Sequence, residues 1–253
     1  AGQSCSAPVY YSCFGTAIIY RTITGLTAAE VTADSMEPEF WHERWAAGQI
    51  GFHQGTTNVF LERFWPSLGL APGSRICVPL CGKSLDMLWL RQQGYAVAGI
   101  ELSPVAVEAF FIENGLQPEC IEGPAHTRWS ADGIDLYCGD FFALDTDATG
   151  AFDGCYDRAA LVALPAHLRR AYSEHLAGLL PAQSRSLLVT MEYVQAGMDG
   201  PPFSVPPAEV HTLFTPGFSV EQIHAADVLE TYPAFRERGL DTLTEHVFRL
   251  TRK

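Results

Sequence analysis

The stretch Val78-Pro79-Leu80-Cys81-Gly82 decides how this chain folds, and Lys83-Ser84-Leu85-Asp86 follows it directly. Its apolar residues predict a strand, and its glycine predicts a tight turn at the mouth of a helix. About twenty residues later, Ile100-Glu101-Leu102-Ser103 predicts the next strand, which ends in a carboxylate. This pair is typical of a site for a nucleotide-like cofactor, because the backbone approaches the ligand at the glycine and the acid binds ribose hydroxyls.

Strands and helices alternate on both sides of this stretch. Strands are predicted over residues 75–80, 96–102, 134–138, 152–156 and 186–193, and helices over residues 84–93, 104–114, 166–180 and 208–214. Residues 118–133 give only short strand or loop signals, and residues 218–225 and 245–251 predict a final antiparallel pair. The alternation predicts an α/β protein with a doubly wound, Rossmann-like, mostly parallel sheet and helices on both faces.

Composition narrows the class of protein. The chain has 253 residues, 47% of them hydrophobic, and a formal charge of −13. The acidity argues against a nucleic-acid partner, and no apolar run is long enough to cross a bilayer. No secretory signal is evident, and the seven cysteines include no Cys-x-x-Cys pair. We therefore expect a cytoplasmic, monomeric protein with reduced thiols, no metal site and no membrane partner.

The amino-terminal part differs from the rest. Residues 1–35 contain few charges, and we expect them to be an extension that is upstream of the native start or foreign to the protein. Residues 36–253 are expected to form the functional domain. Within it, helices predicted over residues 40–45 and 58–68 form an amino-terminal helical lid of about residues 36–70.

Four predicted strand ends mark the ligand crevice of a doubly wound sheet. They are Leu80-Gly82, Glu101, Asp140-Phe142 and Asp157-Arg158. A dinucleotide site normally has three glycines around the pyrophosphate, whereas this turn has only Gly82. S-adenosylmethionine fits better, because it combines an adenosine with an amino-acid tail.

Each candidate cofactor residue also has a structural explanation. Glu101 is expected to accept hydrogen bonds from the ribose hydroxyls, although an acid near a helix start is also favoured by the helix dipole. Asp140 is expected near the adenine amino group, with Phe141 or Phe142 against the ring. The alternative for the two phenylalanines is core packing.

The second group of candidates has equally balanced explanations. Asp157 and Arg158 form an internal ion pair, or Arg158 orients an anionic acceptor. Trp41 and Trp45 share one helix face, either as an apolar stripe or as a lid with an indole near the cofactor sulfonium.

From residue 36 onward the chain resembles the thiopurine S-methyltransferase family, particularly its bacterial members. The matching stretches are Trp41-x-x-x-Trp45, residues 51–55, 78–87, 99–103, 139–142 and 156–161, and the loop Gly200-Pro201-Pro202-Phe203. The resemblance implies a class I, S-adenosylmethionine-dependent methyltransferase with a seven-stranded sheet whose last strand is antiparallel. It implies cofactor contacts at Trp45, Leu80, Glu101 and Arg158. The family has no segment that corresponds to residues 1–35.

The implied reaction is methyl transfer to the sulfur of an aromatic or heterocyclic thiol, or to a selenium or tellurium nucleophile. Asp157 or a water takes the proton, and Arg158 holds an anionic acceptor. An apolar clamp over a flat ring is expected from Phe40, Phe52, Pro202 and Phe203. The alternatives are a methyltransferase with another small-molecule acceptor and a nicotinamide-dependent reductase.

Overall fold

The computed structural model describes residues 38–51 and 53–253. The helices are α1 (Pro38–Ala46), α2 (Val59–Phe64), α3 (Asp86–Gln92), α4 (Pro104–Glu113), α5 (Thr146–Thr149), α6 (Ala166–Leu179), α7 (Pro207–Phe214) and α8 (Pro233–Glu237). The strands are β1 (Arg75–Val78), β2 (Ala96–Glu101), β3 (Glu119–Glu122), β4 (Thr127–Ala131), β5 (Ile134–Cys138), β6 (Gly154–Arg158), β7 (Arg185–Glu192), β8 (Phe218–Asp227) and β9 (Thr244–Arg252). Among these residues, every helix is too short or too polar to span a bilayer.

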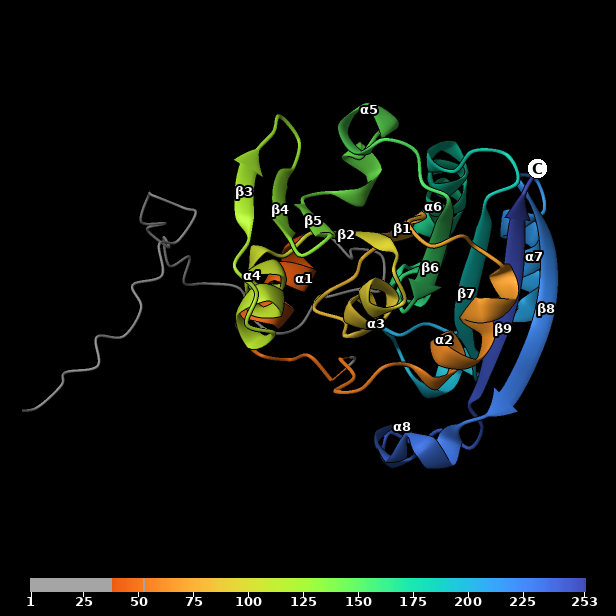
Figure 1. Ribbon diagram of the computed structural model, residues 1–253. Coiled ribbons are helices and arrows are strands. Elements are labelled where there is room, and N and C mark those ends of the chain that lie inside the picture. Colours follow the sequence, from red (N-terminus) through yellow and green to blue (C-terminus); the bar gives the residue numbers. More distant parts are fainter. Residues whose placement is uncertain (1–37, 52) are drawn as a thin grey trace, which may run out of the picture. The chain divides into compact units, whose positions relative to one another are not determined.

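The strands form one mixed sheet in the order β3-β4-β5-β2-β1-β6-β7-β9-β8 (Figure 1). Strands β5, β2, β1, β6 and β7 are parallel, and the last strand, β9, is antiparallel to both of its neighbours. The order reverses at β1, and there the carboxyl ends of the parallel strands leave a crevice for a ligand. The predicted doubly wound fold with an antiparallel last strand is confirmed.

The predicted strand count is wrong, because the residues that the structure describes form a sheet of nine strands and not seven. The two additional strands, β3 and β4, form an antiparallel extension beside β5. They come from residues 118–133, and β3 is at the edge of the sheet with most of its residues exposed. A strand that buries neither face shows no clear hydrophobic alternation, so its sequence signal is weak.

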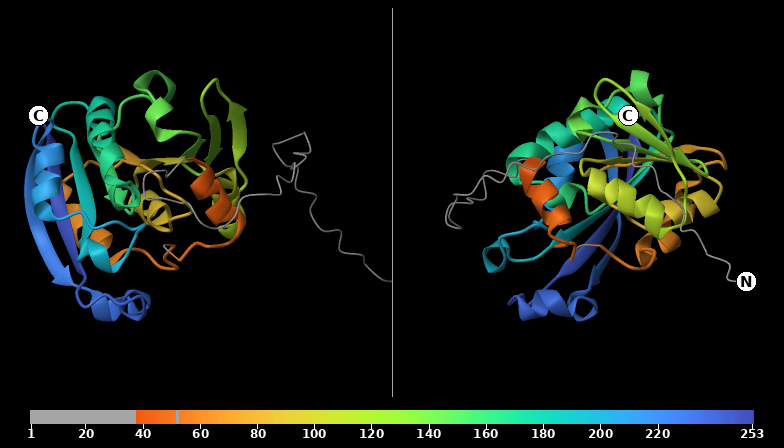
Figure 2. Two further views of the ribbon diagram at one scale, coloured as in Figure 1. Left: turned by 180° about the vertical axis from the view of Figure 1, so that it is seen from behind. Right: turned by 90° about the vertical axis from the view of Figure 1, so that its left-hand side faces the viewer.

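Alternating residues of the strands build two cores, one on each face of the sheet. In β1, Ile76 and Val78 pack in one cluster with side chains of α2, α3 and α4. The intervening Cys77 packs in the other cluster, with side chains of α6 and α7. Figure 1 shows α2, α3 and α4 in front of the sheet, and the rear view in Figure 2 shows α6 and α7 on the other face. Helices on both faces are therefore confirmed.

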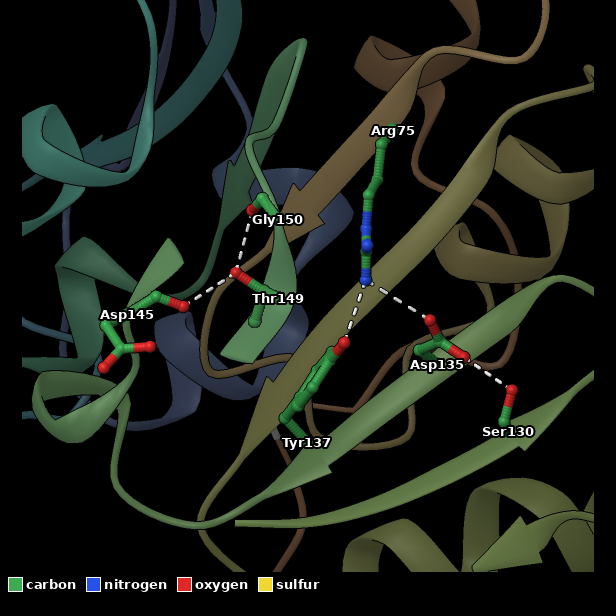
Figure 3. A network of polar contacts seen from close by, with 7 residues as sticks. All are labelled: Arg75, Ser130, Asp135, Tyr137, Asp145, Thr149 and Gly150. Atoms are coloured by element: carbon green, nitrogen blue, oxygen red, sulfur yellow. Dashed lines mark hydrogen bonds and ion pairs between the residues drawn. The ribbon is translucent and has the colours of Figure 1, made fainter. Parts of the chain in front are cut away.

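The amino ends of the strands are fixed by Arg75, at the start of β1. Its guanidinium donates to the hydroxyl of Tyr137 (2.9 Å) and to the carboxylate of Asp135 (3.3 Å), both on β5 (Figure 3). Asp135 also accepts a hydrogen bond from the hydroxyl of Ser130 on β4 (2.5 Å). This network ties β1, β5 and β4 together at the end of the sheet opposite the ligand crevice.

Candidate active site

A cavity of about 380 Å³ lies beyond the carboxyl ends of β1, β2, β5 and β6. Its lining includes a residue from each of these strand ends, namely Leu80, Glu101, Gly139 and Arg158. Helix α1 contributes Trp41 and Trp45, and most of the remaining lining side chains are apolar. A partly enclosed apolar space with a few polar groups is the usual form of a small-molecule site.

The turn after β1 is sharply bent. Leu80 has a φ of +46° and Gly82 a φ of +52°, both in the left-handed region. The amide of Cys81 donates to the carbonyl of Ile100 on β2 (2.9 Å). The turn is therefore held against the neighbouring strand, and the prediction of a tight turn at this point is confirmed.

Glu101 links the turn to the end of β2. Its carboxylate accepts one hydrogen bond from the amide of Gly82 and one from the amide of Ser103, each at 2.8 Å. The two bonds fall on different oxygens, so each oxygen keeps a lone pair for a further donor. Burial raises the pKa of Glu101 to about 7, although these amides partly oppose the shift.

Gly82 has a second role, because Trp45 packs directly on it. A Cβ atom at this position would lie 3.1 Å from Cζ2 of the Trp45 indole. Trp45 is 6% exposed and lines the cavity. The glycine therefore allows the indole to form the wall of the cavity beside the turn.

Gly82→Ala is expected to weaken cofactor binding about tenfold or more, because the indole must move out of the cavity wall. The left-handed φ adds about 1–2 kcal/mol of lost stability. Gly48→Ala is the matched control, since Gly48 has a φ of +65° and no atom within 4 Å of the added Cβ. Calorimetry should show lost affinity for S-adenosylhomocysteine only in the Gly82 variant. Equal affinities in the two variants would show that the Trp45 contact is irrelevant to the cofactor.

Asp86, the last residue of the stretch that begins at Val78, has a structural role. Asp86 is 2% exposed, and its carboxylate accepts hydrogen bonds from the amide of Asn58 (2.7 Å) and the hydroxyl of Tyr156 (2.9 Å). Asn58 is the N-cap of α2, where its side chain accepts from the amides of Phe60 and Leu61. Asp86 therefore joins the start of α3 to the start of α2 and to β6.

The two phenylalanines after β5 have different surroundings. Phe141 is 4% exposed and packs against Tyr172 of α6, with ring centroids 5.1 Å apart. Phe142 is 37% exposed, and both rings line the cavity. The carboxylate of Asp140 accepts from the amide of Phe142 (3.0 Å), and Asp140 also lines the cavity.

Asp157 and Arg158 point to opposite faces of β6. Asp157 is 1% exposed, and its carboxylate accepts from the hydroxyl of Tyr172 (2.6 Å) and the amide of Leu161 (3.2 Å). Burial raises its pKa to about 6. Asp157 is not among the residues that line the cavity. The structure therefore does not place it where it can take a proton from an acceptor, and the predicted internal ion pair with Arg158 is absent from the described residues.

Arg158 lines the cavity at the end of β6. Within the described part of the chain, its guanidinium has no ion pair and no hydrogen bond. A charge that faces a cavity without a protein partner is available for a ligand.

The predicted apolar clamp is only partly present at the cavity. Pro202 lines it, whereas Phe40 and Phe203 do not. Phe40 packs edge-on against Trp41, and the ring of Phe203 lies under the guanidinium of Arg169. These two rings are occupied by neighbouring side chains, and Phe52 lies outside the described residues.

Sequence reasoning missed several cavity residues. The main ones are His53, Gln54, Lys83, Val162, Ala163, Leu164, His167 and Leu168. Residues 51–55 match the family resemblance, but that match alone does not show which side chain faces the ligand. Burial lowers the pKa of His53, and the nearby charges of Lys83 and Arg158 lower it further, whereas Glu113 opposes the shift.

Three kinds of comparison relate the chain to known proteins. The model of the family described as "Thiopurine S-methyltransferase (TPMT)" matches residues 36–253. A thiopurine S-methyltransferase of Pseudomonas entomophila is 51% identical over 217 residues, which cover 86% of this chain and all of that protein. One of Nitrosospira multiformis is 51% identical over 215 residues, covering 85% of this chain and 98% of that protein.

The similar solved structures share the fold at low sequence identity. A methyltransferase from Anabaena variabilis, described as dependent on S-adenosylmethionine, has a TM-score of 0.60 and 16% identity, over 85% of this chain and 95% of that one. The 1,6-didemethyltoxoflavin-N1-methyltransferase of Burkholderia thailandensis, solved with S-adenosylhomocysteine, has a TM-score of 0.56 and 15% identity. That similarity covers 85% of this chain and 87% of the other.

Proposed function

Because this chain belongs to the thiopurine S-methyltransferase family, we propose that it transfers a methyl group to the sulfur of aromatic or heterocyclic thiols. The chain is an S-adenosylmethionine-dependent methyltransferase, and the cofactor leaves as S-adenosylhomocysteine. The nicotinamide-dependent alternative is set aside by this family membership.

The residues of the cavity fit this cofactor. Glu101 keeps one lone pair on each oxygen for the ribose hydroxyls, beyond the amides it already binds. We assign Asp140 and Phe142 to the adenine, because both line the cavity just beyond the end of β5. Leu80 and Gly82 form the turn at which the backbone can approach the amino-acid tail.

S-adenosylmethionine, when bound, supplies an electrophilic methyl group. The protein aligns the acceptor and keeps water away, since the opposite charges of thiolate and sulfonium cancel during transfer. We assign the exclusion of water to Trp41, Trp45 and Pro202, and the orientation of the acceptor to Arg158. Aromatic thiols are acidic enough to ionise near neutral pH, so no strong base is required.

The observation that carries the acceptor class is the guanidinium of Arg158, which lines a mostly apolar cavity and has no ion pair or hydrogen bond with the residues that the structure describes. It favours a flat acceptor that is anionic, either as a thiolate or through a substituent. The test measures kcat/KM for the methylation of aryl thiols, an aliphatic thiol, selenite and tellurite, with labelled S-adenosylmethionine as the methyl donor. The aryl thiols are expected to have the highest kcat/KM. A higher kcat/KM for the aliphatic thiol would contradict the proposed class.

Further parts of the assignment extend beyond the family. Selenium and tellurium compounds are proposed as additional acceptors, because their nucleophiles are softer than sulfur. We also propose a catalytic domain over residues 36–253, a single subunit and a cytoplasmic location. The proposed extension, residues 1–35, lies outside the described residues.

A further inference from the structure

A buried carboxylate, Glu245 of β9, is connected to the cavity by hydrogen bonds. Glu245 is 2% exposed, and its carboxylate accepts a hydrogen bond from the hydroxyl of Tyr232 at 3.2 Å. The same hydroxyl accepts from the side-chain amide of Gln54 at 2.9 Å, and Gln54 lines the cavity. Nothing in the proposed reaction uses Glu245, although burying a carboxylate with so few partners is unfavourable.

Strand register places Glu245 on the same face of the sheet as Arg158. Arg158 of β6 pairs with Val189 of β7, and Val189 pairs with Val247 of β9. Side chains at paired positions share a face, and so do residues two apart in one strand. Glu245 therefore projects from the same face as Val247 and Arg158, with one strand between it and β6. Two strand spacings correspond to about 10 Å, and the two-residue offset between Glu245 and Val247 adds about 7 Å along the strand.

The charges of Glu245 and Arg158 act on each other across this face. Burial raises the pKa of Glu245, whereas the positive charge of Arg158 and the hydrogen bond from Tyr232 lower it. Burial raises the pKa of the Tyr156 and Tyr232 hydroxyls, and the charge of Glu245 raises both further. The carboxylate therefore offsets part of the positive potential that Arg158 presents to the cavity.

We propose that Glu245 is a positioning residue that limits, through its charge, how strongly Arg158 favours an anionic methyl acceptor over a neutral one. This inference rests on the proposed function, in which Arg158 faces the acceptor. Its consequence is a graded acceptor preference, because the net potential at the acceptor is smaller than that of an isolated guanidinium.

The test compares two aryl thiols that differ only in one substituent, a carboxylate or its carboxamide. The readout is the ratio of their kcat/KM values, with the anionic thiol in the numerator. Glu245→Gln is expected to raise this ratio about 3- to 10-fold, because it removes one negative charge from the face of the sheet that carries Arg158. The new amide oxygen can still accept from Tyr232, so the hydrogen-bonded network remains.

The matched control is Glu192→Gln. Glu192 ends β7, in the same sheet, but its carboxylate pairs with His246 (2.8 Å) on the opposite face from Val189. The Glu192→Gln variant should leave the ratio unchanged. An unchanged or lower ratio in the Glu245→Gln protein would overturn the proposal, as would an equal rise in the Glu192→Gln protein.

Two further variants separate the possible causes. In an Arg158→Ala background the effect of Glu245→Gln should shrink, and an undiminished effect would overturn action through Arg158. If Glu245→Gln does not fold, Glu245→Met removes the charge at similar length and should raise the ratio in the same direction. If Arg158→Ala alone leaves the ratio unchanged, the role of Arg158 in the proposed function fails. If Arg158→Ala changes the ratio but Glu245→Gln does not, only this inference is overturned and the proposed function stands.

Discussion

Glu101→Ala is expected to weaken the binding of S-adenosylhomocysteine about 30- to 150-fold, which corresponds to about 2–3 kcal/mol. The loss follows from two charge-assisted hydrogen bonds to the ribose hydroxyls. The variant also leaves the half-buried amide of Gly82 and the buried amide of Ser103 without their acceptor, so the free energy of unfolding should fall by about 1–3 kcal/mol. Isothermal titration calorimetry and a thermal melt measure the two effects separately.

The control for this experiment is Glu108→Ala, an exposed glutamate on the following helix, α4. It should leave the affinity unchanged. A wild-type affinity in the Glu101→Ala protein would remove Glu101 from the cofactor site.

The pH dependence of binding gives an independent check on Glu101. Its pKa of about 7 in the free protein means that the carboxyl becomes protonated below neutral pH. Protonation removes an acceptor, so wild-type affinity should fall as the pH drops below 7, by at most about tenfold per pH unit. The free energy of unfolding depends on pH in the opposite sense. Because the pKa of Glu101 is raised from 4.5 to about 7 in the folded protein, the group adds stability at low pH, and this stability is lost as the pH rises through 7. Glu101→Gln should remove this component of the pH dependence.

Arg158→Lys is expected to lower kcat/KM about 10- to 100-fold for an anionic thiol, and clearly less for a neutral one. The lysine keeps the charge but loses the planar fork that binds an anion through two hydrogen bonds. Its melting temperature should change little, because the structure shows no partner for the guanidinium among the described residues. Steady-state rates on both thiols, together with thermal melts, measure these effects.

Arg249→Lys is the matched control, since Arg249 pairs with Glu221 at the surface of β8 and β9. It should change neither rate. A destabilised Arg158→Lys protein with equal fractional losses on both thiols would contradict a role in orienting the acceptor.

The sequence determined the order of strands and helices and the position of the ligand crevice. Both depend on local patterns: apolar runs of strand length, turns at glycine, and helix starts such as Ser103-Pro104. Glu101 and Gly82 could also be predicted, because their positions at consecutive strand ends follow from the alternation alone. The edge strand β3 could not, because a strand that is mostly exposed shows little hydrophobic alternation.

Only the tertiary structure decided which side chains face the cavity. Asp157 and Arg158 are successive residues of β6 and therefore point to opposite faces, but only the packing of the elements shows that the face of Arg158 borders the ligand crevice while Asp157 bonds Tyr172. Gln54, Tyr232 and Glu245 come from distant parts of the chain and meet through hydrogen bonds that no sequence spacing specifies. The physical reason is that hydrophobic periodicity specifies which face of an element is buried, whereas the partner of each polar group depends on how the elements pack together.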